Sequence, residues 1–195
     1  PDCARRTQNV YMSRMKRIAT WFRDGLSGGR FAVRAGTVFA AAWLVCLAPF
    51  VFEGTVPGGF WADTNRNLPF RTILRRALAH GDFPDLAAGM YLGQPLMSIG
   101  QPAPLYPSNL VGLIVPLPDR EFLWFDLWVH AALAAAGMAW WLRRRGASAA
   151  VALALGWAYS CSSVFLFRLD GHWTLVHQAA WMPWLLAAWE GLDGA

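Results

Sequence analysis

Acidic and imidazole side chains occur at three places in this chain where they could take part in chemistry. The first is Asp63, about ten residues past a strongly apolar stretch, in a Pro- and Gly-rich loop that spans residues 53–120. A carboxylate can serve there as a general base or help to hold a divalent cation. Some membrane enzymes keep their catalytic acid in a loop of this kind, at the outer membrane boundary. We therefore expect the catalytic acid in this loop.

The second place is the pair Asp126 and His130, which lie four residues apart within an apolar stretch. On a helix this spacing puts both side chains on one face. Ionisable groups are costly in hydrocarbon, so both should face a helix bundle or water. Two interpretations stay open: the residues pair with each other or with a neighbouring helix, or they line a polar cavity that leads to the outer face.

The third place is Asp170 and His172, which are separated by one glycine, with His177 shortly after them. Carboxylate and imidazole groups near Asp63 could bind a divalent cation or position an acceptor. A solvated turn is the alternative interpretation of the same spacing.

The composition indicates which elements must position these residues. The chain is 56% hydrophobic and only 15% charged, against roughly 25% charged residues in an ordinary soluble domain. Its apolar residues gather into runs near the ~20 residues that cross a ~30 Å hydrocarbon core, and tryptophans lie at several run ends. The net charge of +5 comes without any groove-reading motif, which argues against a nucleic-acid partner. We predict an all-α polytopic membrane protein.

The predicted organisation has about four transmembrane helices and one long outer loop. A basic segment covers residues 1–35, the spans cover 36–52, 121–142, 147–167 and 173–189, and the loop covers 53–120. The first apolar run is longer than a signal-peptide core, which favours an uncleaved anchor. The chain begins at Pro1 and ends just after the last span, so we expect a C-terminal remainder to be missing.

The distribution of Lys and Arg predicts the orientation. Residues 1–35 and the turn Arg143–Arg145 together hold eleven, whereas the loop 53–120 and Arg168 hold six. The positive-inside rule then places the N-terminus in the cytoplasm. Alternation of the spans puts Asp63 and Asp170 on the same outer face.

An amphipathic helix is predicted inside the loop at residues 68–80, with Gly81 as its stop signal. It is too short to span a membrane and should lie in the interface. Its apolar face holds Phe70, Ile73, Leu74, Ala77 and Leu78, while Arg71, Arg75 and Arg76 lie elsewhere on it. The helix either packs on the membrane surface or holds a phosphate near Asp63.

Small residues recur every fourth position in the third predicted span, at Ala152, Gly156 and Ser160. This spacing is typical of close helix packing in membranes. Sequence patterns for a Walker loop, a zincin, a nucleophile elbow and a dinucleotide fold are absent, which argues against those chemistries.

Four stretches, taken in order, resemble a known family. They are Asp63–Phe70 (DTNRNLPF), Gly93–Pro107 (GQPLMSIGQPAPLYP), Leu142–Gly146 with the small-residue span after it, and Gly171–Glu190 (GHWTLVHQAAWMPWLLAAWE). The chain resembles the bacterial YfhO-like membrane proteins, which belong with the GT-C type membrane glycosyltransferases. The likeness covers nearly everything after Gly36.

The resemblance implies transfer of a sugar from a polyprenyl-phosphate-linked donor to an acceptor on the outer face of the bacterial cytoplasmic membrane. The acceptor would be an envelope polymer, a glycolipid or a protein. Asp63 would be the catalytic or metal-organising acid, with Asp170 and His172 as a second outer-loop element. A divalent cation, Mg²⁺ or Mn²⁺, would bind at Asp63 and Asp170.

A lipid-phosphate leaving group needs cations at the interface, for which Arg71, Arg75 and Arg76 are the candidates. An alternative function of a different class is a non-catalytic transporter or envelope-assembly protein. In that case Asp126 and His130 would form a proton or substrate path.

Overall fold

The computed structural model describes residues 29–54, 69, 72–77, 79–82, 86–87, 94–95, 106–115, 117–166 and 173–193. Within these ranges the chain is helical except for turns and one two-residue antiparallel ladder. The ladder joins β1 (Leu86–Ala87) to β2 (Gln94–Pro95).

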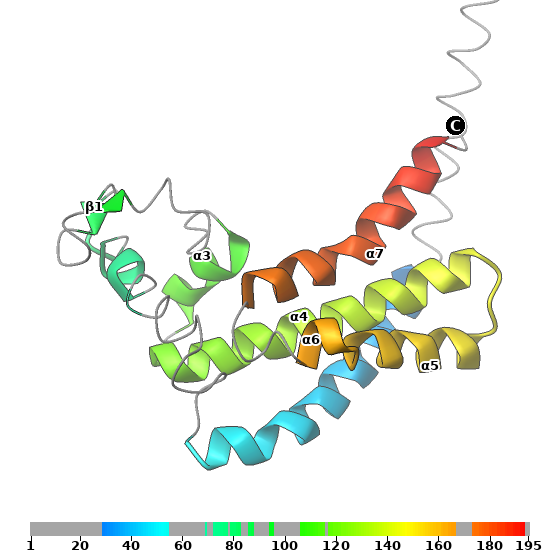
Figure 1. Ribbon diagram of the computed structural model, residues 1–195, viewed down its shortest axis with the longest axis horizontal. Helices are drawn as coiled ribbons and strands as arrows, with labels where there is room; N and C mark the ends of the chain where they lie inside the picture. Colours follow the sequence, from blue (N-terminus) through cyan, green and yellow to red (C-terminus); the bar gives the residue numbers. More distant parts are fainter. Residues whose placement is uncertain are drawn as a thin grey trace, which may run out of the picture.

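The helices follow in chain order (Figure 1). They are Gly29–Phe52, a loop helix described at residues 69, 72–77 and 79, α3 (Pro107–Ile114), α4 (Asp119–Arg144), α5 (Ala149–Ser160), α6 (Ser163–Leu166) and α7 (Trp173–Asp193).

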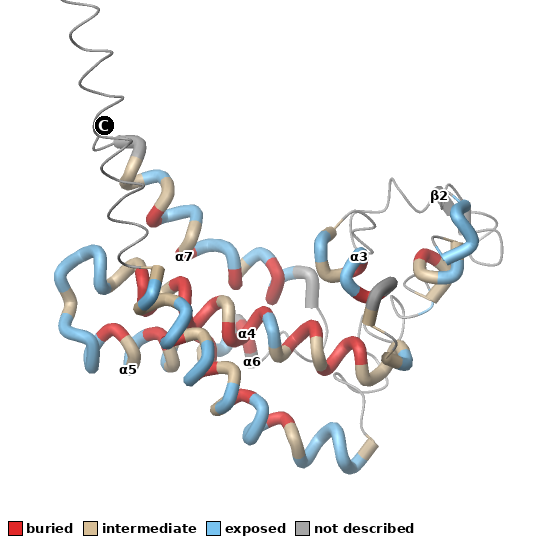
Figure 2. Tube along the Cα trace, turned by 180° about the vertical axis from the view of Figure 1, so that it is seen from behind, coloured by how far each residue is buried: buried red, intermediate tan, exposed pale blue. Residues whose placement is uncertain are grey.

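The helix α4 is the centre of the bundle. Helix Gly29–Phe52, α5 and α7 all pack against it, so that most of its length is buried (Figure 2). One apolar cluster joins α4 to helix Gly29–Phe52, α6 and α7, and a second joins α4 to helix Gly29–Phe52 and α5. The buried side chains of α4 are therefore held by neighbours from several helices.

Two helices in the described part are long and apolar enough to cross a membrane, by length and composition: Gly29–Phe52 and α4. They cover the first two predicted spans. Within the most apolar 18 residues of each helix, 22% of the residues are buried in Gly29–Phe52 and 72% in α4. The first helix therefore turns most of its apolar surface outward, with Val33, Val45 and Phe52 among its exposed side chains.

The third predicted span, 147–167, is interrupted. Its first helix, α5, has only 12 residues, and a turn at Cys161–Ser162 separates it from the short α6. The run Ser160–Ser163 explains the break, since serine hydroxyls compete with helical backbone bonds; the Ser160 hydroxyl donates to the Trp157 carbonyl oxygen at 2.9 Å. At 12 residues α5 is too short to cross a bilayer alone.

The bundle has two distinct ends. At the loop end, the Arg120 guanidinium of α4 donates to the carbonyl oxygen of Gly54 at 2.9 Å, so the two ends of the long loop meet. At the basic end, the Arg143 guanidinium lies 5.5 Å from the centre of the Phe31 ring, and Arg145 pairs with Glu190. Helix Gly29–Phe52 therefore runs antiparallel to α4, while α7 runs parallel to it.

The turn at the basic end is built from local signals. Gly146 adopts φ 88°, a left-handed conformation that favours glycine. The Gly146 and Ala147 amides then bond back to the carbonyls of Arg143 and Leu142, which closes α4. Ser148 caps the start of α5 by accepting a bond from the Val151 amide.

The contact between α4 and α5 depends on small residues. Ala152, Gly156 and Ser160 are the buried residues of α5. A methyl group added at Gly156 would lie 2.6 Å from the backbone oxygen of Ala135, so the two backbones touch there. The small residues that recur at every fourth position of α5 therefore face α4.

The helix α7 contains a buried proline, Pro183. A proline has no N–H, so the carbonyl of Ala179, four residues earlier, loses its helical partner. The Tyr159 hydroxyl of α5 donates to that carbonyl oxygen at 2.8 Å. A side chain from another helix thereby replaces the missing backbone bond.

Candidate functional site

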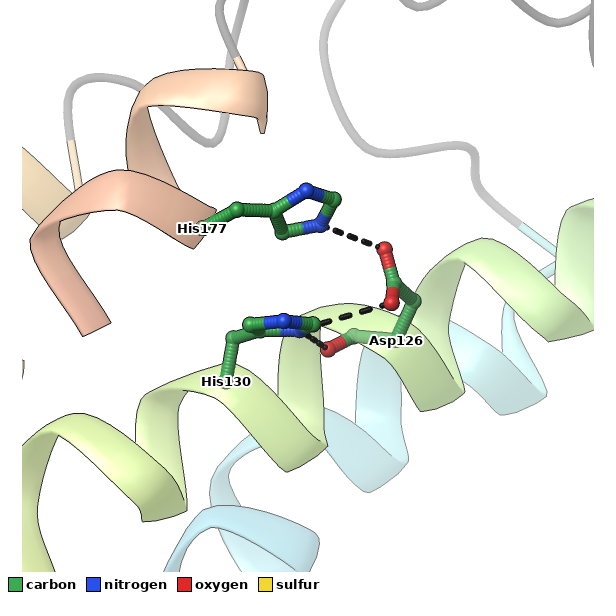
Figure 3. Close-up of side chains that lie close together, drawn as sticks. All are labelled: Asp126, His130 and His177. Atoms are coloured by element: carbon green, nitrogen blue, oxygen red, sulfur yellow. Dashed lines mark hydrogen bonds and ion pairs between the residues drawn. The ribbon is translucent and has the colours of Figure 1, made fainter. Parts of the chain in front are cut away.

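Asp126, His130 and His177 form a buried cluster between α4 and α7 (Figure 3). His177 Nε2 lies 2.7 Å from Asp126 Oδ2, and His130 Nδ1 lies 3.4 Å from Asp126 Oδ1. The two imidazole ring centres are 4.1 Å apart. The residues are 1%, 4% and 5% exposed, so all three polar groups are removed from solvent.

Helix geometry explains why these residues meet. Asp126 lies seven residues into α4 and His130 one turn further on the same face, while His177 lies four residues into α7. Since α4 and α7 run parallel from the loop end, residues at similar depth in the two helices face one another. The cluster is therefore about two helical turns below the loop end.

Tyr106 and Trp181 border the cluster. Tyr106, the residue before α3, has its hydroxyl 2.7 Å from His130 Nε2 and its ring stacked on His177 at 4.6 Å. The Trp181 indole N–H donates to the Tyr106 oxygen at 2.7 Å. These contacts attach the last part of the long loop to the interior of the bundle.

The hydrogen bonds indicate where the protons lie. His130 Nδ1 faces the Asp126 carbonyl oxygen and so carries the ring proton, which leaves Nε2 to accept the O–H of Tyr106, while the Tyr106 oxygen accepts from Trp181. The Nδ1–H of His130 then donates to the Asp126 carbonyl oxygen at 2.7 Å. His177 Nε2–H donates to the Asp126 carboxylate. The cluster is thus a continuous network from Trp181 to His177.

Burial raises the pKa of the Tyr106 phenol. The bond from Trp181 lowers it by less, and the negative charge of Asp126 raises it further. Tyr106 therefore stays protonated at neutral pH and keeps its role as a donor to His130.

The three cluster residues form a group that could hold a metal ion. Each offers one ligand atom, and these atoms lie within 4.8 Å of one another. Imidazole nitrogen with carboxylate oxygen is a common ligand set for transition metals.

A pocket of about 380 Å³ lies at the loop end, between the loop helix, α3 and the start of α4. Arg75, Arg76 and Asp119 are among its lining residues. Arg75 forms an ion pair with Asp119, donates to the Leu117 carbonyl and lies over the Phe122 ring. The exposed Arg76 has no ion-pair partner among the described residues, so it is the cation available to a ligand.

The predicted site residues fall into two groups. Asp126, His130, Arg75 and Arg76 are described; the structure brings Asp126 and His130 together in the buried cluster and places Arg75 and Arg76 in the lining of one pocket. Asp63, Arg71, Asp170 and His172 lie outside the described residues, as does most of the basic segment 1–35.

Three further residues join the site. Sequence reasoning linked His177 to the outer-loop acids, whereas the structure places it against Asp126. Tyr106 and Trp181 were not singled out, although their aromatic rings flank the histidines. Similar depth from the loop end is the signal that could have joined His177 to Asp126.

No protein-family model matches the chain, and neither the search of curated proteins nor that of solved structures found a similar protein.

Proposed function

We propose that this protein is a polytopic membrane glycosyltransferase of the GT-C type, similar to YfhO-like proteins. It transfers a sugar from a polyprenyl-phosphate-linked donor to an envelope acceptor on the outer face of the bacterial cytoplasmic membrane. One observation carries the proposal: a buried carboxylate–imidazole network and an Arg-lined pocket lie at the same end of α4, where the long loop begins and ends.

The apolar surface supports the membrane part of this proposal. Helix Gly29–Phe52 exposes Val33, Val45 and Phe52, and α7 exposes Leu185 and Trp189. Such side chains outside a bundle fit a lipid environment. Arg143, Arg144 and Arg145 lie at the opposite end from the loop, which fits a cytoplasmic basic end.

The chemistry of the reaction fits an interfacial site. An acceptor hydroxyl needs a base, for which we propose Asp63, and the lipid-phosphate leaving group needs positive charge. The exposed guanidinium of Arg76 lines the pocket and can supply this charge. We propose that Asp63 and Asp170 hold a divalent cation, Mg²⁺ or Mn²⁺, and that His172 belongs to the second outer-loop element.

The test compares envelope glycans of cells that lack the protein with cells that express it or its variants. The wild-type protein should restore the glycan that is lost in the deletion, and Asp63→Asn should not, although it inserts normally. Asp82→Asn, an exposed aspartate after the loop helix, is the matched control and should restore it. A deletion with an unchanged glycan profile would contradict the proposal.

A transporter is the second candidate, because Asp126 is fully buried beside two histidines and could relay protons. In a transporter Asp126→Asn would abolish activity and Asp63→Asn would be silent. In the transferase Asp63→Asn abolishes glycan transfer. The same complementation experiment therefore separates the two functions.

A further inference from the structure

The cluster of Asp126, His130 and His177 has the composition of a mononuclear metal centre. We propose that these residues bind one divalent transition-metal ion, with Zn²⁺ as the probe that tests it. This centre is distinct from the Mg²⁺ or Mn²⁺ assigned to the outer loop. It stands whether or not the protein transfers sugars.

The spacing of the donor atoms supports the centre. In a tetrahedral zinc site with bonds of about 2.0–2.1 Å, neighbouring ligand atoms are about 3.3 Å apart. His177 Nε2 and His130 Nδ1 lie 2.7 and 3.4 Å from the two oxygens of Asp126. One ligand atom from each of the three residues lies within 4.8 Å of the other two, which is close enough for one ion to be shared.

The ligand types select the class of metal. Two imidazoles and one carboxylate form the set used by catalytic zinc and non-haem iron sites. Mg²⁺ and Ca²⁺ prefer oxygen ligands, so two histidines disfavour them. A divalent transition metal is therefore the matching occupant.

The surroundings resemble those of a metal site. Burial excludes water from all three ligands, which strengthens their attraction for a cation. The Tyr106 oxygen, which also accepts from Trp181, lies 2.7 Å from His130 Nε2 and fixes the ring with Nδ1 toward Asp126, where a metal ion takes the place of the Nδ1 proton. Outer hydrogen bonds of this kind orient metal-binding histidines.

The experiment measures metal in the full-length protein, purified in detergent without chelators and equilibrated with Zn²⁺. Elemental analysis should find about one zinc ion per chain in the wild type. His177→Asn and Asp126→Asn should each lose at least about nine-tenths of it, since loss of one ligand from three leaves a weak site. His80→Asn, an exposed histidine on the loop helix, should retain the wild-type content.

A second measurement needs no variant. X-ray absorption of the zinc-loaded wild type should show two imidazole ligands and one oxygen donor from carboxylate. Zinc content equal in wild type and His177→Asn, or a bound ion without imidazole ligands, would overturn the proposal. Neither readout depends on sugar transfer, so failure of the metal site and failure of the transferase are distinguishable.

Discussion

The two faces of α4 make different kinds of contact: one packs small residues closely, and the other joins polar side chains. Toward α5 the contact is close and made of small residues, with Gly156 against the backbone of Ala135. Toward α7 it holds a carboxylate, two imidazoles and the Trp184 indole, which donates to the Leu133 carbonyl at 3.1 Å. The same helix thus serves as a structural support on one side and as a polar site on the other.

This difference shows how a bundle accommodates polar residues inside an apolar environment. Close backbone contact leaves no room for side chains to move, so the α5 face fixes α4 in place. The α7 face uses long side chains whose polar atoms bond one another. A polar site is tolerated because its partners come from both helices.

The first prediction has the largest expected effect and concerns the polar face, which is the contact between α4 and α7. Asp126→Ala removes the acceptor of His177 and leaves a buried imidazole without that bond. We expect a loss of about 3–5 kcal/mol in the free energy of unfolding, as for other broken buried pairs. SDS-titrated unfolding of the purified protein measures it. The exposed Asp82→Ala should change stability by less than about 0.5 kcal/mol, and an equal effect of both variants would refute the assignment.

The second prediction compares glycines on the two faces. An added methyl group at Gly156 meets backbone, whereas one at Gly137 meets the indole of Trp184. Backbone cannot yield easily, so Gly156→Ala should cost about 1–3 kcal/mol.

Gly137→Ala should cost less, because the indole can rotate and give up one hydrogen bond. Gly29→Ala, where nothing lies within 4 Å, is the control for helix propensity and should be neutral or stabilising. The same unfolding titration ranks the three variants. A larger loss at Gly137 than at Gly156 would reverse the comparison of the two faces.

The third prediction concerns the bond that joins α5 to α7. Tyr159→Phe leaves the Ala179 carbonyl without the donor that substitutes for the missing N–H of Pro183. We expect a loss of about 1 kcal/mol, the scale of interhelical hydrogen bonds in membranes. In the double variant with Pro183→Ala the backbone donor returns, so the Tyr159→Phe effect should shrink. If the stability losses of Tyr159→Phe and Pro183→Ala simply add, the Tyr159 hydroxyl does not replace the missing backbone donor.

The smallest effect is expected at the rim of the polar face. Arg145 and Glu190 join the ends of α4 and α7 at 2.8 Å, with side chains 61% and 36% exposed. Exposed ion pairs contribute little, so Glu190→Gln should cost less than about 1 kcal/mol. Raising the salt concentration should remove even that difference. A loss that persists at high salt would mean that Glu190 has another role.

Local signals in the sequence account for much of the fold. The length of one apolar run predicted a helix at residues 121–142, and α4 is observed at Asp119–Arg144. Gly81 adopts φ 78° after the loop helix, as a helix-ending glycine does. These features depend on neighbours in the chain, which is why pattern reasoning reaches them.

Features that depend on contacts between helices were harder to predict. The break after Ser160 was not expected, since hydropathy alone does not register competition from serine hydroxyls. The contact between His177 and Asp126 was not expected for a similar reason, since the two residues are 51 positions apart in the sequence. Tyr106 enters the site only because α3 folds onto the ends of α4 and α7 (Figure 1). Pairings of this kind are set by three-dimensional packing.

The bond between Arg120 and the Gly54 carbonyl has a consequence for how such a protein can diverge. It holds together two residues that are 66 positions apart in the sequence. Doubling the length of a flexible loop costs only about 0.6 kcal/mol in closure entropy. Apart from the loop helix, Tyr106 and α3, which contact the bundle, this connection can therefore change in length while the helices keep their positions. Descendants of one bundle could acquire new ligand preferences by changing this connection alone.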